Sequence, residues 1–183
     1  MNKFPYSGEK ATQAAAWLVA LAGGKMNHIK LSKLLYIADR RALKRWGRPI
    51  IGGEYANMEH GPVVSPVVDC LKPVGGRPPN DYWDACFSRK VNEIILVENP
   101  GRGQLHAAAI KLLDEIFLEL GHLSQWELRD LTHEFPEYSD VGKSSKGINL
   151  PVLLGHLKKS TEQINALEAQ AAELTGLKKL IGC

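Results

Sequence analysis

His60 is the side chain in this sequence best suited to proton transfer near neutral pH, because imidazole titrates close to that pH. It lies in Met58-Glu59-His60-Gly61-Pro62, where the glycine and the proline restrict the backbone path. General acid–base catalysis requires a second positioned group, and the sequence does not identify one. We therefore expect the His60 ring to hold its loop through a hydrogen bond to a loop carbonyl or to Asp39. A contact with a partner and a catalytic role are the alternatives.

Ser124, Asp130 and His133 could be read as a hydrolase triad, since these are the residue types of that machinery. However, Ser124 followed by Glu127 is the spacing of a capping box, which begins a helix through Thr132 and uses the serine hydroxyl. The three cysteines have no C-x-x-C spacing, so neither a disulfide framework nor a zinc site is indicated. The sequence therefore predicts no catalytic residue, no bound metal and no cofactor.

A basic amphipathic helix is predicted over residues 29–46, because its apolar side chains recur at spacings of three, four and seven. At about 100° per residue they fall on one face, which should pack in the core. Basic residues occupy much of the opposite arc, including Lys33, Arg40 and Lys44, and Arg48 follows the helix. A solvated surface is the simplest role for this arc. An acidic patch on a protein partner, or nucleic acid phosphates, are the alternatives.

Two β-strands are predicted over residues 82–89 and 93–98, where aromatic and β-branched residues are concentrated, with a turn over 90–92. Trp83 and Phe87 are four residues apart and should point to the same side of the first strand as core contacts. If they were exposed instead, they would offer a docking surface. A two-stranded hairpin is marginally stable alone, so it should lie on the helical body.

The remaining elements are mostly helical. Ser65 should cap one helix, with Pro66 at its first position, and Ser160 with Gln163 should cap the last. Residues 140–147 are rich in glycine and serine and should form a mobile loop. The further helices are predicted over residues 11–22, 63–71, 105–120, 124–132, 150–157 and from 160 onward.

The expected fold is mostly α: a compact single-domain helical bundle with a small two-stranded β-hairpin near residues 82–98. The length of 183 residues suits one core, and 44% hydrophobic with 23% charged residues is a globular composition. We expect a lead-in over residues 1–10, a domain over 11–140, and a helical extension over 141–183 packed on the same domain. No apolar run is long enough to cross a bilayer, so a cytoplasmic location is expected.

An ordered set of short motifs resembles the signature of the Panacea domain, the SocA-like antitoxin family. The resemblance extends from about residue 11 to residue 138, and where the family often has Pro-Ala-Trp this chain has Pro136-Glu137-Tyr138. The matching segments are Lys33-Leu34-Leu35-Tyr36-Ile37-Ala38-Asp39-Arg40, Gly47-Arg48-Pro49-Ile50, Tyr55, Met58-Glu59-His60-Gly61-Pro62-Val63, Leu123-Ser124-Gln125-Trp126-Glu127-Leu128 and Leu131-Thr132-His133.

The resemblance implies a non-enzymatic antitoxin that neutralises a toxin encoded by an adjacent gene through direct protein–protein binding. It also implies that relatives are frequent in phages and mobile elements. A nucleic-acid-binding regulator that acts through the basic face of residues 29–46 is the alternative. Composition and periodicity are compatible with both functions and establish neither.

We expect two sets of functional residues. The residues expected to bind the partner are Lys33, Tyr36, Arg40, Lys44, Arg48, Tyr55, His60, Pro62 and Trp83. The residues expected to carry the motif or a structural role are Asp39, Gly47, Pro49, His60, Gly61, Pro62, Ser124, Glu127, Thr132 and His133.

Overall fold

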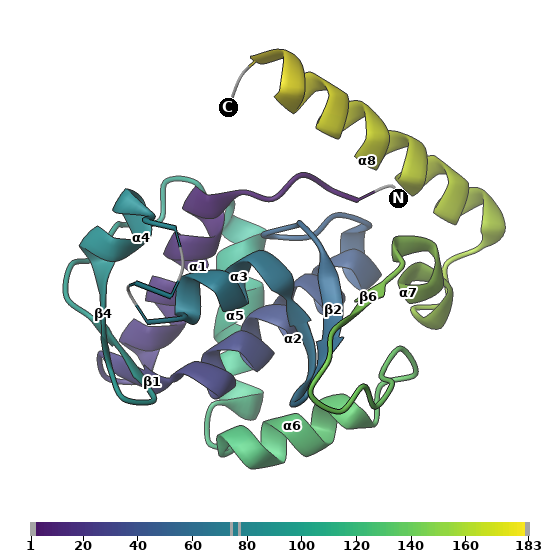
Figure 1. The fold of residues 1–183 in the computed structure, drawn as a ribbon. Helices are drawn as coiled ribbons and strands as arrows, with labels where there is room; N and C mark the ends of the chain where they lie inside the picture. The colour runs from purple at the N-terminus through teal and green to yellow at the C-terminus, as the bar shows by residue number, and fades with distance from the viewer. Residues whose placement is uncertain (1–2, 74, 77, 182–183) are drawn as a thin grey trace.

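A computed structural model describes residues 3–73, 75–76 and 78–181 of the chain. The predicted mostly helical fold class is confirmed, with small antiparallel sheets beside the helices (Figure 1). The helices are α1 (Gly8–Leu21), α2 (His28–Trp46), α3 (Ser65–Leu71), α4 (Asp81–Cys86), α5 (Ala107–Leu120), α6 (Gln125–His133), α7 (Leu150–His156) and α8 (Thr161–Ile181). The strands are β1 (Lys25–Asn27), β2 (Tyr55–Met58), β3 (Gly61–Val64), β4 (Phe87–Lys90), β5 (Glu93–Leu96) and β6 (Lys146–Ile148).

The α2 helix lies at the centre of the molecule, in contact with α1, α5, α6 and β3. It begins where the Asn27 side chain accepts hydrogen bonds from the amides of Ile29 and Lys30, which would otherwise lack partners at the helix start. It ends at Gly47, whose φ of 75° is a conformation that glycine adopts without strain. Every residue from Leu31 to Asp39 is buried, so the helix has no solvated arc over this stretch.

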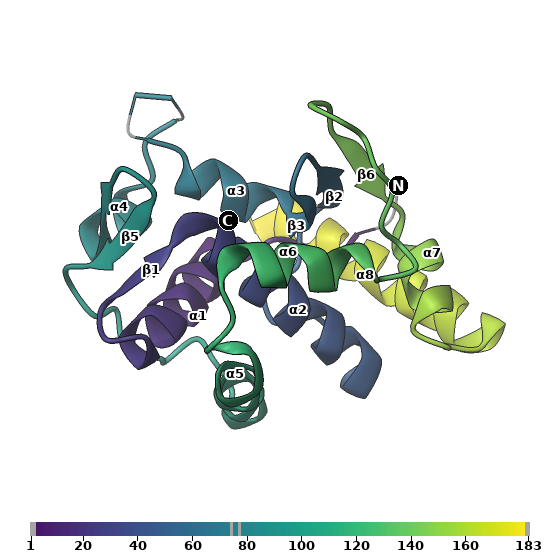
Figure 2. The same ribbon diagram turned by 90° about the horizontal axis from the view of Figure 1, so that it is seen from below.

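The strands form two three-stranded antiparallel sheets, with orders β1-β5-β4 and β3-β2-β6. The two views place these sheets on opposite sides of α3 (Figure 2). In the first sheet Met26 pairs with Ile94, and in the second Ala56 lies between Val63 and Gly147. Each sheet therefore includes one strand distant in sequence from the hairpin that it joins.

The C-terminal helix α8 lies beside the N-terminal segment of the chain (Figure 1). Its Thr175 hydroxyl donates to the carbonyl of Lys3 at 3.0 Å, and its Ala171 is fully buried. At its other end Leu167 packs against Gly47, where an added Cβ would lie 2.9 Å from the Leu167 Cδ2 atom. These contacts join α8 to both the chain start and the end of α2.

The hairpin expected over residues 82–98 differs from the prediction at its first strand. Residues Asp81–Cys86 form α4, because the Asn80 side chain accepts from the Trp83 amide and starts a helix there. The strand pairing begins only at Phe87, and β1 adds a third strand to it. Trp83 and Phe87 are both buried with ring centroids 4.4 Å apart, as expected for core contacts.

Three further expectations are corrected. The segment around His60, expected as a loop, is the tip of a hairpin formed by β2 and β3. Part of the expected loop at 140–147 belongs to β6. Ser65 begins α3 but its side chain does not cap it, since Val64 holds the cap position. The capping box of Ser160 with Gln163 is confirmed.

The predicted segments 1–10 and 141–183 include residues 1, 2, 182 and 183, and the loop after α3 includes residues 74 and 77. These six lie outside the described residues. Within the part of the chain that is described, no helix is long and apolar enough to cross a membrane.

Candidate partner-binding surface

Asp39 anchors the segment that leads from α2 into β2. Its buried carboxylate accepts hydrogen bonds from the amides of Ile50 at 2.8 Å, Ile51 at 2.8 Å and Gly52 at 2.9 Å, and from the Tyr55 hydroxyl at 3.0 Å. Burial raises the pKa of Asp39 to about 6, although these hydrogen bonds oppose the shift. All four donors come from within the chain, so Asp39 has a structural role.

Glu137 is a second buried carboxylate, and it joins α2 to the segment after α6. It accepts from the Tyr36 hydroxyl at 2.8 Å and from the Arg40 guanidinium at 2.6 Å, and its backbone carbonyl accepts from the Asn57 side chain at 2.9 Å. The Arg40 guanidinium also lies 4.1 Å from the Phe135 ring centroid. The sequence shows Glu137 only as part of a motif, because its side-chain partners Tyr36 and Arg40 lie about a hundred residues away.

Lys33 is fully buried, although the predicted amphipathic pattern placed it on the solvated arc. Its ammonium group donates to the carbonyl of Pro62 at 2.9 Å, which ties α2 to β3. Among the described residues no carboxylate forms an ion pair with it. Desolvation lowers the pKa of Lys33 to about 7.

Gly61 lets the β2–β3 hairpin approach α6 closely. Its φ is +91°, and an added Cβ would lie 2.8 Å from the Cδ2 atom of His133 and 3.1 Å from the hydroxyl of Thr132. The His133 ring is stacked on Tyr138 with centroids 4.0 Å apart. Desolvation lowers the pKa of His133, and the positive charges of Lys33 and Arg129 lower it further. The Thr132–His133 pair therefore packs against the hairpin.

The predicted hydrogen bond from His60 to Asp39 or to a loop carbonyl is absent among the described contacts. The His60 ring instead makes an edge-on contact with Trp126 on α6, at a centroid distance of 5.7 Å. Asp39 is unavailable because its four donors occupy it. Trp126 keeps 45% of its surface exposed, and the Arg129 guanidinium lies 5.1 Å from its ring.

The Ser124–Glu127 capping box is confirmed. The Glu127 amide donates to the Ser124 hydroxyl at 3.2 Å, and the Ser124 amide donates to the Glu127 carboxylate at 2.8 Å. Asp130 pairs with its neighbour Arg129. The imagined triad is therefore not assembled, and no group of three His, Cys, Asp or Glu residues within the described chain could hold a metal ion.

Much of the basic arc of α2 is neutralised by α5. Arg41 forms a two-point ion pair with Glu119, at 2.6 and 2.8 Å, and Arg45 pairs with Glu115 at 2.5 Å. This pairing removes most of the free positive charge that phosphate binding would require. Lys44, nearby on the same helix, is exposed.

The structure divides the residues expected to bind a partner into two groups. One group is buried and holds the fold, because other elements cover the residues of α2 and of the β2–β3 hairpin. This group consists of Lys33, Tyr36, Tyr55, Pro62 and Trp83. Arg40 is committed to Glu137. The surface retains Lys44, Arg48 and part of His60.

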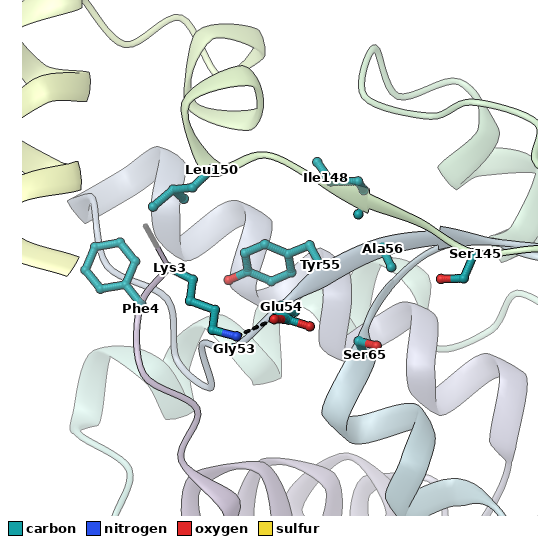
Figure 3. A pocket seen from close by; sticks show the side chains of 11 residues that line it. Lys3, Phe4, Gly53, Glu54, Tyr55, Ala56, Ser65, Ser145, Ile148 and Leu150 are labelled. Atoms are coloured by element: carbon teal, nitrogen blue, oxygen red, sulfur yellow. Dashed lines mark hydrogen bonds and ion pairs between the residues drawn. The ribbon is translucent and has the colours of Figure 1, made fainter. Parts of the chain in front are cut away.

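Among the concave regions of the described surface, two lie beside residues discussed above. The first, of about 320 Å³, lies between the N-terminal segment, β2 and β6, and an ion pair between Lys3 and Glu54 crosses it beside the Tyr55 ring (Figure 3). The second is a groove of about 350 Å³ between the start of α2, the tip of the β2–β3 hairpin and the end of α3. His60 lines this groove, which places the Trp126 contact at its edge.

Comparison with known proteins gives the family. The model of the family described as "Antitoxin SocA-like, Panacea domain" matches residues 31–138. The chain is similar to "Antitoxin SocA" of Caulobacter vibrioides (strain NA1000 / CB15N), with 26% identity over 127 residues, which cover 68% of this chain and 64% of that protein. No solved structure matches. The matched span contains Lys33, Asp39 and Gly61, whose contacts are described above. The chain belongs to the SocA-like antitoxin family that carries the Panacea domain.

Proposed function

We propose that this protein is the antitoxin of a toxin–antitoxin system and that it neutralises a toxin encoded by an adjacent gene by binding it directly. The observation that carries the proposal is the family match over residues 31–138. The named relative is an antitoxin, and the comparison spans 64% of its length. The toxin and the mode of neutralisation are therefore part of the proposal.

The contacts of the motif residues support a binding function. Asp39, Glu137 and Lys33 fix α2 to the segment before β2, to the segment after α6 and to β3. Three such links between distant segments make a stiff body. A surface that is already ordered loses less conformational entropy on association, which favours tight binding.

The same contacts support a role without catalysis. Side chains that could do acid–base chemistry are engaged in the fold: Asp39 with backbone amides, Ser124 as a helix cap and His133 stacked on Tyr138. His60 contacts Trp126 and is not paired with a carboxylate among the described residues. A catalytic pair needs two groups within hydrogen-bond reach.

Co-expression tests the proposal. The adjacent reading frame is expressed alone, with this protein and with the His60→Ala variant, and growth is followed. We expect the frame to arrest growth alone, and both forms of this protein to restore growth and to co-purify with the toxin. A harmless frame, persistent toxicity, or rescue without a complex would contradict neutralisation by binding. Loss of rescue by a folded His60→Ala variant that still co-purifies with the toxin would instead favour an active role for this histidine.

A further inference from the structure

The groove beside His60 combines positive charge with an apolar lining. Ile29, Val63, Val68 and Leu71 contribute apolar side chains from α2, β3 and α3. Lys33, Lys72 and Arg89 also line it, whereas Glu59 is its single carboxylate among the described lining residues. Basic side chains therefore outnumber carboxylates in the described lining, and the rest of the lining is largely apolar.

Backbone carbonyls hold two of these cations. The Arg89 guanidinium donates to the carbonyls of Val91 and Leu71, and the Lys33 ammonium donates to the carbonyl of Pro62. A carbonyl orients a cation without cancelling its charge, since it carries only a partial charge. Arg89 is therefore fixed in place with its charge uncompensated by any carboxylate in the described chain, and the buried Lys33 also has no carboxylate partner there.

Lys33 is fully buried beside this groove. Desolvation lowers its pKa to about 7. A carboxylate placed in the groove would raise that pKa again, because a nearby opposite charge favours the ammonium form.

The surface next to the groove has the residue types that contribute most to protein–protein affinity. Trp126 is 45% exposed, lies against His60 at the groove edge and has the Arg129 guanidinium 5.1 Å from its ring. Tryptophan and arginine are enriched among the few residues that dominate binding energy in interfaces. The groove and this pair thus form one continuous face.

We propose that this groove receives an acidic, partly apolar segment of the cognate toxin, with the segment's carboxylates directed at Arg89 and Lys72. This inference rests on the proposed antitoxin function and adds the chemistry of the partner and the location of its contact. Charge complementarity selects an acidic segment, and the apolar lining selects a protein over a polyphosphate backbone.

The test measures affinity for the purified product of the adjacent reading frame by calorimetry. Val68→Glu puts a carboxylate into the groove from its half-buried wall, and Val68→Gln is the matched control with similar shape and no charge. We expect Val68→Glu to weaken binding by about 10-fold or more and Val68→Gln by no more than about 3-fold. Thermal unfolding of each variant shows that it is folded.

A second pair of variants keeps the test decisive if the α3 substitutions unfold the protein. Lys72 is exposed and pairs with Asp69 one helical turn away, so Lys72→Glu and Lys72→Gln should both fold. The same order of affinities is expected. A poly-glutamate peptide should compete with the toxin, whereas a single-stranded oligonucleotide of equal charge should compete poorly.

The outcomes separate the two proposals. If the unmodified protein does not bind the toxin product, the antitoxin proposal fails and the groove assignment falls with it. If the unmodified protein binds but both glutamate variants bind equally well, the groove assignment fails and the antitoxin proposal stands. Equal losses of affinity in the glutamate and glutamine variants would indicate apolar docking and would overturn the proposal of an acidic partner. Competition by the oligonucleotide alone would indicate a nucleic acid ligand and would overturn it as well.

Discussion

Glu137 and Arg40 form an ion pair that is largely withdrawn from water. The Arg40 Nε atom lies 2.6 Å from the carboxylate, whose side chain is fully buried, while the arginine side chain keeps 16% of its surface exposed. The hydroxyl of Tyr36 donates to the same oxygen. A buried carboxylate with a charged donor and a neutral donor is satisfied only while both are present.

Glu137→Gln should therefore destabilise the protein by about 2–4 kcal/mol, because it leaves the Arg40 charge without its partner. The free energy of unfolding from urea titration measures this effect. Glu115→Gln is the matched control, since Glu115 pairs with Arg45 at an exposed site, and it should cost no more than about 1 kcal/mol. Equal losses in the two variants would show that the Glu137 pair adds nothing beyond a surface contact.

Asp39→Asn should cost about 2 kcal/mol or more, because the new amide group presents a donor where the fold offers only donors. The four groups that now donate to Asp39 cannot all bond to the asparagine side chain. Unfolding by urea is again the measurement. Asp130→Asn, at a carboxylate whose side chain is 65% exposed, is the control and should change stability by less than about 1 kcal/mol. A neutral result for Asp39→Asn would mean that the three-amide contact is not maintained.

Gly61→Ala should be more costly than Gly24→Ala, although both glycines have φ above +90°. Each substitution strains the backbone by about 1 kcal/mol. Only Gly61 has a neighbour in the way, the His133 ring at 2.8 Å from the added Cβ, whereas nothing lies within 4 Å at Gly24. We expect a difference of about 1–3 kcal/mol in the free energy of unfolding. Equal costs would contradict the close approach of the hairpin to α6.

Lys33 should make stability rise with pH above neutrality. Its pKa is about 7 in the folded protein and near 10.5 in the unfolded chain, so the unfolded chain holds the extra proton between these values. The free energy of unfolding therefore increases as pH rises through this window and is unaffected by Lys33 below it. Urea titrations at about pH 6.5, 8 and 9.5 span this window and should show the rise of the unfolding free energy with pH. The slope should be smaller in Lys33→Met, which has no titrating group. Parallel pH profiles would place the Lys33 pKa near its ordinary value.

Asp39 acts in the opposite direction at lower pH. Burial raises its pKa from 3.8 to about 6, so the folded carboxyl keeps a proton that the unfolded one has lost. The contribution of this raised pKa to the free energy of unfolding is fully present below about pH 4. It is lost as pH rises through about 6. Comparison with Asp39→Asn over pH 4–7 measures it, and a constant difference in unfolding free energy over this range would contradict the shift.

The amino-acid sequence by itself determined features that depend on neighbours along the chain. The Ser124–Glu127 and Ser160–Gln163 caps and the end of α2 at residue 46 depend on nearby residues, so the local sequence predicted them. The mostly helical fold class follows from the same periodicity. The motifs also identified the family that the matched span confirms.

The tertiary structure alone decided which side chains are available to a partner. Lys33 lies in the interior because α6 and β3 cover an arc of α2 that its own periodicity predicts to be solvated. Glu137 accepts from Arg40 across 97 residues, and β6 joins β2 from a segment that reads as a loop. Pairings between distant segments depend on how the whole chain packs, which local propensity does not encode.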